Sequence, residues 1–520
     1  MNKKSIFLPV IAILLTGCNI LSTNTSHSNP SHNDNNSTSN VENSGGHNNT
    51  DNSTPNLEGG YYKANQVKYT MRDVNEKVGW NTLNSTENQK ILVVPVQLSG
   101  GTTWSSKMLT NLEKVFFGKS SDTSWRSVSS FFDESSYGKL HITGEVTEVL
   151  KVTNYTVTSL NKLGEEASDV IANLFDKSNI IPTSKRKEYD QDNDGFLDAT
   201  IFVYSNNYST SGSSAYWAWC YYTENDNNYN APVVNNYMWA SYSFMEDGYD
   251  TSYAPTGLDA HTYIHETGHL LGLDDYYCYD ETRPWDCAGD RDMQSYNIGD
   301  HNIYSKLALG WINPYVVTDS CEINLRSSAL YDDAILIKDN WNGSVFDEYL
   351  LIEFYTPEGN NSQDSRYAYS SRNKMYDYSG LRIYHVDARL VKYEMDRRGY
   401  ITSAEYVNDF VNNANCFVGA SNSIDYQYLM SKQNPRDYIR YLHLIDKGGK
   451  NTLTAGTSSS KNSIKIDASS TLWETGDTFT ATSQYFANGN NKFNDGSKVG
   501  YSVTVGKIVN GTINVKINKI

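Results

Sequence analysis

The alternation of apolar and polar residues in the first half of the chain follows both strand and helix spacing. The run 91–98 is almost wholly apolar, which is typical of a strand buried on both faces, and Pro95 within it indicates an irregularity or a sheet edge. Amphipathic helices are predicted over 108–117, 127–135 and 160–175, and further strands over 140–149 and 199–204. Strands mixed with helices predict an α+β domain over residues 61–320.

A further helix is predicted to begin near residue 260, with one face suited to burial. That face consists of Ala260, Tyr263, Ile264, Thr267, Leu270 and Leu271. Thr256 and Asp259 offer capping-box chemistry at its start. Gly272 follows the last helical position, where a glycine can take up the left-handed conformation that ends a helix. The chain can therefore turn back toward the helix after Gly272.

After residue 319 the pattern changes to short apolar runs of strand length. The chain closes with two such runs, 501–508 and 512–517, joined by Asn510-Gly511, a strong hairpin signal because both positions tolerate positive φ. The earlier runs cover 334–338, 349–354, 381–386 and 438–445. Residues 321–520 are therefore predicted to form a β-rich, β-sandwich-like region.

The N-terminus carries a processing signal and a polar tether. The apolar run 6–15 follows two lysines and has the size of a signal-peptide core, too short to span a bilayer. The residues Leu-Thr-Gly-Cys that end at Cys18 resemble the bacterial lipobox, so 1–18 is predicted to be a lipoprotein signal with Cys18 lipidated. An ordinary secretory signal with an incidental cysteine is the alternative. Residues 19–60 are rich in Ser, Asn and Thr and predict a disordered tether.

Composition limits the partners of the chain. A formal net charge of -17 argues against nucleic acid and against electrostatic docking on anionic lipid. We therefore expect the N-terminal lipid to hold the protein on the extracellular face of the bacterial cell membrane, from which it can also be released. The folded part is expected to be monomeric. Cys278 and Cys287 can form a disulfide or be free buried thiols. The other cysteines after Cys18 are Cys220, Cys321 and Cys416.

The sequence HETGHLLGLDD at 265–275 has the composition of a catalytic metal site. On a helix, His265 and His269 lie one turn apart on the same face and can bind one ion. Glu266 is rotated by about 100° from His265 and can reach a water in an open coordination position as a general base. This arrangement predicts a zinc peptidase. A chance match, or a site that is present but idle, is the alternative.

The third ligand is expected directly after Gly272. Asp274 and Asp275 are the first carboxylates that can return toward the ion. In the extended metzincin pattern H-E-x-x-H-x-x-G-x-x-H/D the third ligand is the eleventh residue, here Asp275, and Asp274 is the alternative. Met293 lies suitably downstream for the methionine that these peptidases carry beneath the metal.

From about residue 90 to 390 the chain resembles the immune-inhibitor-A-like metallopeptidases of bacteria. The matching segments are ILVVPVQL, SVSSFFDESSYGKLHITGEV, DQDNDGFLDATIFVYS, HETGHLLGLDDYY, DMQSYNIGDHNIYSKLALGWINP and GLRIYHVD. Many relatives have Pro where this chain has Asp274. The resemblance implies a metzincin-like zinc endopeptidase with structural calcium. The resemblance also implies that the zinc ligands are His265, His269 and Asp275, that the base is Glu266, and that Met293 lies under the metal.

A second acidic motif precedes the predicted strand 199–204. Its carboxylates alternate with other residues and a glycine stands at the sixth position, which is the arrangement that wraps oxygen ligands around calcium. It is not an EF-hand, because the twelfth position is Ile201 and a strand follows. The predicted calcium ligands are Asp190, Asp192, Asp194 and Asp198. An acidic surface turn is the alternative.

Other polar residues receive weaker assignments. His261 lies one turn before His265, and a supporting or solvent-exposed role is favoured because a catalytic zinc needs only three protein ligands and water. Tyr296 and Tyr304, which follow Met293, are candidates to donate to the oxyanion of a tetrahedral intermediate. His385 and Asp387 are interpreted as structural polar groups at a strand end.

Together these patterns predict a secreted, lipid-anchored zinc endopeptidase that hydrolyses extracellular proteins or peptides. Zinc is expected to polarise the scissile carbonyl and its bound water, while Glu266 takes the proton of the water and delivers it to the leaving amine. The alternative is a catalytically idle lipoprotein that uses a peptidase scaffold for surface binding or adhesion. The intact Glu266 counts against it, because a structural zinc has no use for a base.

Overall fold

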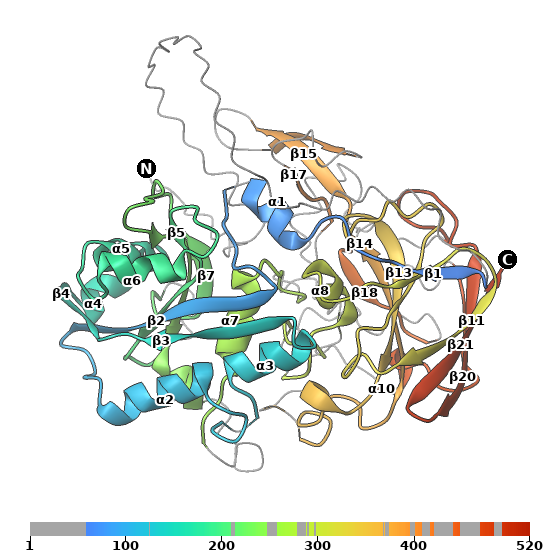
Figure 1. Cartoon of the computed structure of the whole chain (residues 1–520), viewed down its shortest axis with the longest axis horizontal. Coiled ribbons are helices and arrows are strands. Elements are labelled where there is room, and N and C mark those ends of the chain that lie inside the picture. The colour runs from blue at the N-terminus through green and yellow to red at the C-terminus, as the bar shows by residue number, and fades with distance from the viewer. Residues whose placement is uncertain are drawn as a thin grey trace, which may run out of the picture.

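The structure is a computed structural model, and it combines helices with several sheets (Figure 1). The mixed character predicted for the chain is confirmed. None of the helices in the described ranges has the length and apolar character needed to cross a membrane. The described residues are 59–77, 79–123, 125–209, 214–246, 257–277, 288, 291–295, 298–367, 369, 374–395, 401–407, 416–420, 440–447, 468–482 and 491–520. Predictions on residues 1–58 with Cys18, and on Thr256, Cys278, Cys287 and Tyr296, lie outside them.

The first sheet is built around β2 (Glu87–Ser99) and has the order β3-β2-β6-β9-β7, with β4 also paired to β2. The other strands are β3 (Leu140–Val146), β4 (Leu150–Thr156), β6 (Thr200–Tyr204), β7 (Trp219–Tyr222) and β9 (Asn236–Ser241). All of these pairings are parallel except that of β7 with β9. A short pair, β5 (Phe196–Leu197) and β8 (Val233–Val234), lies beside this sheet. The strand predicted over 140–149 is shorter in the structure, because β3 ends at Val146.

Pro95 lies at an interruption of the sheet. On one side, β2 pairs with β3 as far as Val93 and with β4 from Val96 onward. Pro95 has no N–H to donate and falls between these two partners. The predicted irregularity is confirmed. The edge position is wrong, because β6 pairs along the other side of β2.

Helices cover both faces of the first sheet. Alternate residues of β2 point to opposite faces, so this strand contributes to a core on each side of the sheet. Ile91 and Val93 share a core with α2 (Ser106–Phe117), α3 (Val128–Ser135) and α7 (His261–Leu270). Leu92 and Val94 share a second core with α5 (Glu166–Asp176). The predicted helix over 160–175 is two helices, because Gly164 adopts φ +58 between α4 (Val157–Asn161) and α5. The short helices are α6 (Thr183–Arg186), η2 (Lys187–Tyr189) and η3 (Tyr242–Glu246).

The start and the end of α7 differ in how well they follow the sequence pattern. The predicted capping box is wrong, because the helix begins at His261 and Ala260 occupies the N-cap position. The Oδ1 atom of Asp259 accepts a hydrogen bond from the backbone N–H of His261 at 2.8 Å. Gly272 adopts φ +97, so the predicted left-handed helix end is confirmed.

Two sheets packed face to face contain most of the strands after residue 320, and one of them also includes two strands from within residues 61–320. The six-stranded sheet contains, in order, β1 (Tyr61–Lys63), β10 (Tyr315–Val317), β12 (Ile335–Ile337), β13 (Glu348–Tyr355), β14 (Gly380–Asp387) and β18 (Leu442–Leu444). The four-stranded sheet contains β11 (Cys321–Arg326), β21 (Thr512–Lys519), β20 (Tyr501–Val509) and β19 (Thr478–Thr480). Asn510 and Gly511, both at positive φ, form the predicted β20–β21 hairpin.

Smaller elements border these sheets. A three-stranded sheet has the order β16-β15-β17. Its strands are β15 (Leu390–Met395), β16 (Ile401–Tyr406) and β17 (Cys416–Val418). The remaining helices are α1 (Met71–Lys77), α8 (Ile303–Ala308), η4 (Gly359–Asn361) and α10 (Ala468–Thr471).

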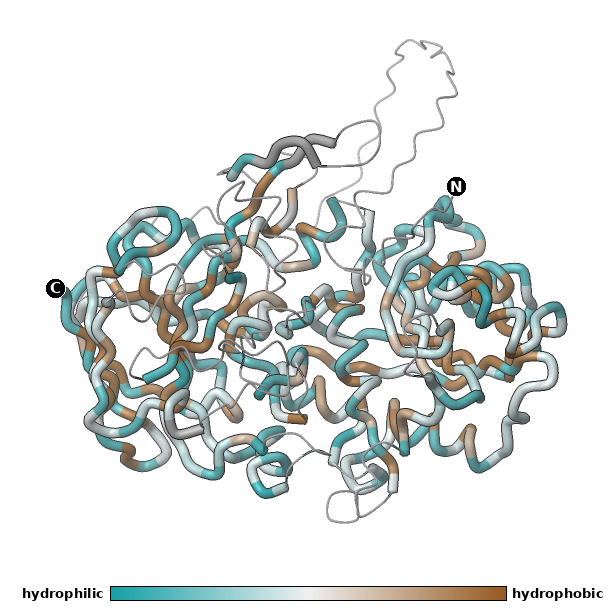
Figure 2. The backbone as a smooth tube through the Cα atoms, turned by 180° about the vertical axis from the view of Figure 1, so that it is seen from behind, coloured by the Kyte–Doolittle hydropathy of each residue, from teal (hydrophilic) through white to brown (hydrophobic). Residues whose placement is uncertain are grey.

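Strand β13 joins the two halves by burying both of its faces. Leu350 and Ile352 point into the core between the two C-terminal sheets. Tyr349 and Leu351 point the other way, into the core that also contains residues of α7 and α8. Apolar segments accordingly run through the interior of both halves in Figure 2. The C-terminal half is thus packed against the half that contains α7.

Residues 60–86, which we call the N-terminal strap, connect the two halves. Figure 1 shows β1 of this strap in blue beside the C-terminal strands, and β1 pairs antiparallel with β10. Farther along, the indole N–H of Trp80 donates to Asn236 Oδ1 at 2.8 Å, and the backbone N–H of Leu83 donates to the Leu270 carbonyl at 2.9 Å. Trp80 and Leu83 are buried. The strap is therefore part of the folded core.

A protein that begins at residue 60 should fold, whereas one that begins at residue 87 should not, because the latter lacks the buried side chains of the strap. Within the intact strap, Trp80→Ala should lower the free energy of unfolding by about 3–5 kcal/mol. Chemical denaturation measures this change, with exposed Tyr229→Ala as the aromatic control. A stable, cooperatively folding protein that begins at residue 87 would contradict the assignment.

Candidate metal centre

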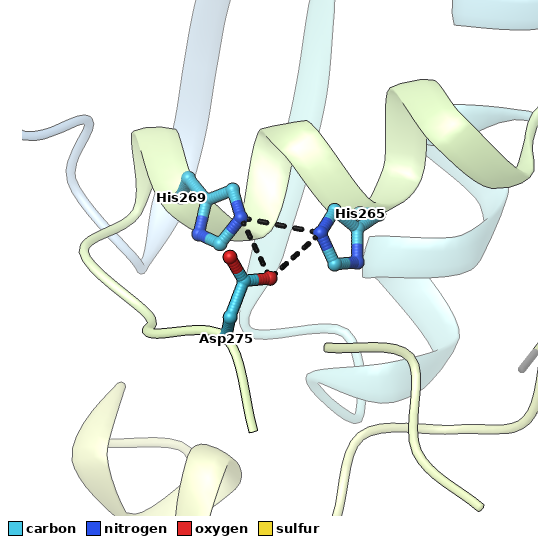
Figure 3. A group of neighbouring side chains, drawn as sticks. All are labelled: His265, His269 and Asp275. Carbon is cyan, nitrogen blue, oxygen red and sulfur yellow. Dashed lines mark hydrogen bonds and ion pairs between the residues drawn. The ribbon is translucent and has the colours of Figure 1, made fainter. Parts of the chain in front are cut away.

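Helix α7 brings the two imidazoles of the HETGH segment to one place. The helix packs against β9, β7 and α3, and its residues from Tyr263 to Leu270 are buried. The Nε2 atoms of His265 and His269 lie 3.2 Å apart. Figure 3 shows both rings pointing toward the carboxylate of Asp275, whose Oδ1 lies 3.0 Å from Nε2 of His265 and 3.4 Å from Nε2 of His269. Three potential ligand atoms therefore converge, all within 4.8 Å of one another.

The turn after α7 determines which carboxylate reaches the two imidazoles. The N–H of Gly272 donates to the His269 carbonyl at 2.8 Å, and that of Leu273 donates to the Gly268 carbonyl at 2.9 Å, which closes the helix. A Cβ atom at Gly272 would lie 2.4 Å from Nδ2 of Asn75 in the strap. The structure brings Asp275 to the imidazoles, and Asp274 is not part of the converging group.

Backbone carbonyls fix the orientation of both rings. His265 Nδ1 lies 2.8 Å from the Met293 carbonyl, and His269 Nδ1 lies 2.7 Å from the Leu273 carbonyl. Because a carbonyl oxygen can only accept, each Nδ1 carries a hydrogen, and the Nε2 atoms are the ones that face Asp275. Metal-binding histidines are oriented by hydrogen bonds of this kind. Two Nε2 atoms with one carboxylate also match the ligand set of a catalytic zinc.

The electrostatics of the three groups favour a positive charge between them. Burial opposes charge on Asp275, but His269 and His265 hold its pKa well below the usual range. Burial likewise disfavours protonated His269, but Asp275 raises the pKa of His269 to about 9. A shared proton or a bound cation satisfies the same need, so the residues fit a divalent metal ion.

Glu266 lies next to this group with one oxygen available. It is buried, and among the described residues its Oε2 atom has no hydrogen-bond partner. Burial raises the pKa of its carboxyl above the usual range, which makes the carboxylate a stronger base. The thiol of Cys220 in β7 donates to the backbone carbonyl of Glu266 at 3.0 Å. This contact places the edge of the first sheet beside Glu266.

Met293 is fully buried, and its carbonyl is the acceptor for His265. Its neighbours Asp292 and Gln294 were not among the residues predicted for the site. The Oδ1 atom of Asp292 accepts from the Gln294 backbone N–H at 2.8 Å, and Gln294 Nε2 donates to the His265 carbonyl at 3.2 Å. Polar residues also flank this stretch on both sides, so no sequence pattern distinguishes Asp292 and Gln294.

His261 and Tyr304, which were predicted with less support, are not part of the converging group. The ring of His261 lies 6.3 Å from that of His265 and 4.5 Å from that of Tyr369, so it borders the converging group without joining it. The hydroxyl of Tyr304 is bonded to that of Tyr441 at 2.7 Å, inside the core. Tyr296 lies outside the described residues.

His385 and Asp387 have the structural roles that were predicted for them. Nε2 of His385 lies 2.8 Å from Oε1 of the buried Glu348. Arg389 donates from Nε and Nη2 to the two oxygens of Asp387, at 2.8 and 2.7 Å. Asn494 contacts the same Asp387 carboxylate through Nδ2 at 3.0 Å. These residues tie β14 to the loop before β20.

The acidic loop before β5 forms a second convergent group. Potential ligand oxygens of Asp190, Asp192 and Asp194 lie within 4.8 Å of one another. Asp198 is not part of that group, and its carboxylate accepts from the backbone N–H of Gln191 at 3.1 Å. Burial raises the pKa of Asp194 to about 6 and that of Asp198 to about 8.

Two contacts join this acidic loop to the N-terminal strap. Arg72 donates to Asp192 Oδ2 at 2.5 Å, and Asn81 donates to Asp194 Oδ2 at 2.7 Å. Gly195 adopts φ +88, and a Cβ atom there would lie 2.9 Å from the backbone nitrogen of Asn228. Ile201, at the twelfth position, is buried in β6, as expected for a loop that is not an EF-hand.

A buried ion pair braces the segment that follows Met293. Nζ of Lys306 lies 2.7 Å from Oδ2 of Asp300, and both side chains are buried. Asp300 Oδ1 also accepts from Ser135 in α3 at 2.6 Å and from the His301 backbone N–H at 3.0 Å. From the C-terminal half, Arg382 Nη1 donates to the Arg291 carbonyl at 3.2 Å. Both halves therefore hold the turn beneath the converging group.

Lys306→Met should lower the free energy of unfolding by about 3–5 kcal/mol, because it leaves Asp300 charged and unpaired in the interior. Lys374→Met, which breaks an exposed pair with Asp377, is the matched control and should have little effect. Denaturant titrations of the two variants check the difference. Equal, small effects would show that the buried pair does not brace the turn.

Comparison with known proteins supplies no independent assignment. No family model matches the chain. No curated protein matches it either. The functional proposal therefore depends on the residues and the geometry described above.

Proposed function

We propose that the protein is a zinc-dependent endopeptidase. One observation carries the proposal: two imidazole Nε2 atoms and the Asp275 carboxylate converge beside Glu266, whose Oε2 has no partner among the described residues. A purely structural site does not need a buried carboxylate oxygen that lacks a partner among the described residues and lies next to the ligands. In this assignment His265, His269 and Asp275 hold the ion and Glu266 is the general base.

The proposed mechanism assigns each step to a residue of the chain. When bound, zinc supplies Lewis-acid polarisation of the scissile carbonyl and of the attacking water. Glu266 accepts a proton from that water through Oε2 while the water oxygen bonds to the carbonyl carbon. The same carboxyl group then gives the proton to the amide nitrogen as the C–N bond breaks. Burial supports the cycle, because it raises the pKa of Glu266 toward that of an effective acid and base.

The edge strand β7 offers a place for an extended peptide. In the described part of the chain β7 pairs with β9 on one side only. Cys220 of this strand contacts the backbone carbonyl of Glu266. A peptide that adds to the side of β7 opposite β9 by backbone hydrogen bonds would therefore pass close to Glu266. Backbone recognition of this kind favours protein and peptide substrates of varied sequence.

The wider assignment follows the resemblance and the N-terminal pattern. We propose a metzincin-like member of the immune-inhibitor-A-like peptidases, attached through lipidated Cys18 to the outer face of the cell membrane and acting on extracellular proteins. The positions of Gly272, Asp275 and Met293 around α7 support it. We also propose that Asp190, Asp192 and Asp194 hold a structural calcium ion, with Asp198 supporting the loop.

Glu266→Gln should lower kcat on a generic protein substrate by roughly 10²–10⁴-fold and leave zinc binding intact, because the amide cannot accept the proton. The parent protein should lose activity to a zinc chelator and regain it when zinc is restored. The exposed Glu188→Gln is the matched control. Full activity of Glu266→Gln would refute the mechanism. Zinc binding without hydrolysis by the parent would favour a surface-binding role.

Calcium should raise Tm more at about pH 8 than at about pH 5. The raised pKa values of Asp194 and Asp198 mean that the ion-free folded protein binds these protons more tightly than the unfolded chain. The stability of the ion-free protein therefore falls as the pH rises from about 5 to about 8, and calcium offsets this loss by neutralising the carboxylates. Thermal melts with and without calcium measure the shift.

The calcium-dependent shift should vanish in Asp194→Asn and persist in Asp226→Asn, a matched change at an exposed position of the same half. A shift of equal size in both variants would remove the calcium proposal.

A further inference from the structure

Gln294 contacts each of the segments that supply the converging groups. Its side-chain Nε2 donates to the backbone carbonyl of His265 at 3.2 Å. Its own carbonyl accepts from the N–H of Tyr276, the residue after Asp275, at 2.8 Å. It also directly follows Met293, whose carbonyl orients His265. One residue therefore links the helix, the segment with the third carboxylate and the turn beneath them.

The fit between Gln294 and α7 depends on a glycine within the HETGH motif. A Cβ atom at Gly268 would lie 2.2 Å from Oε1 of Gln294 and 2.7 Å from its Cδ atom. These distances are far shorter than any van der Waals contact, so only glycine at 268 lets the amide lie against the helix. Glycine in a helix interior costs about 1 kcal/mol relative to alanine, and this close approach is a physical reason to accept that cost.

The other side of Gln294 is held just as firmly. Its Oε1 atom lies 3.3 Å from Nε2 of the buried His301. Because an amide oxygen can only accept, Nε2 of His301 is the donor. Asp292 holds the backbone of the turn, since its Oδ1 accepts from the Gln294 N–H and its Oδ2 accepts from Asn302 at 2.7 Å. The amide of Gln294 is thus fixed between α7 and His301.

We propose that Gln294 is a positioning residue that sets the distance of Asp275 and the Met293 carbonyl from the metal-binding face of α7, with Gly268 as the surface it docks on. This inference rests on the proposed zinc site. It concerns the arrangement of the ligands and not the chemical steps. It also explains why a polar side chain is buried beneath the ligands: both ends of its amide group are used.

Four proteins test the docking: the parent, Gly268→Ala, Gln294→Ala and the double variant. Zinc affinity of each metal-free protein is measured by competition with a chelating dye, and kcat, KM and Tm are measured alongside. We expect each single change to weaken zinc binding by about 10- to 100-fold. In the double variant the alanine Cβ no longer meets the amide, so zinc should bind no more weakly than in Gln294→Ala alone.

Gln89→Ala is the matched control, because Gln89 of β2 is also buried and donates through its amide, but to the backbone carbonyl of Thr86 at the end of the N-terminal strap. It should lower Tm without changing zinc affinity. Because Gly268→Ala tests the contact without altering Gln294, the inference stays open to refutation if one variant folds poorly. Unchanged zinc affinity in either folded single variant, or strictly additive losses in the double variant, would overturn it while leaving the peptidase proposal in place. A parent protein that binds no zinc would overturn both.

Discussion

The buried imidazoles of His265 and His269 must each donate their Nδ1–H to an acceptor, and much of the architecture around α7 follows from this requirement. The two acceptors, the carbonyls of Met293 and Leu273, belong to different segments. One segment returns through the left-handed Gly272, and the other comes from a turn well downstream. A buried donor without a partner costs on the order of 1–3 kcal/mol, so both segments are held against the helix. With both segments in place, the two Nε2 atoms lie close to each other and to Oδ1 of Asp275.

The turn with Met293 lies between the two halves, so the C-terminal half contributes to the site. Arg382 of β14 donates to the Arg291 carbonyl and pairs with Glu353 of β13 at 2.7 Å. On the opposite side, Lys306 and Asp300 link the following segment to α3. The sandwich is therefore continuous with the floor beneath α7 and is not simply an appended binding module. The face of its six-stranded sheet that points away from the four-stranded sheet packs into the same core as α7.

Features with a short repeat or a local backbone cause were predictable from the sequence. The i, i+4 spacing of His265 and His269, the helix end at Gly272 and the hairpin at Asn510 each depend on neighbouring residues. The capping box is not formed, because α7 begins only at His261; Asp259 instead also accepts a hydrogen bond from the hydroxyl of the distant Tyr369, at 2.7 Å. The contacts that Gln294, Cys220 and Arg382 make near the site were not predicted either. Their partners lie far along the chain, and no sequence period records such contacts.

The pairing of β1 with β10 also determines the order in which the molecule can be completed. The earliest described strand has no partner until residue 317 has been made, and β11 waits for β21 at the far end of the chain. Such distant pairings are slow to form because a long loop must close first. A nascent chain that has reached Asp275 already holds both imidazoles and the carboxylate, but it lacks Met293, Arg382 and the sandwich. A rigid ligand set is therefore a property of the finished chain, and a partly synthesised one would not have it.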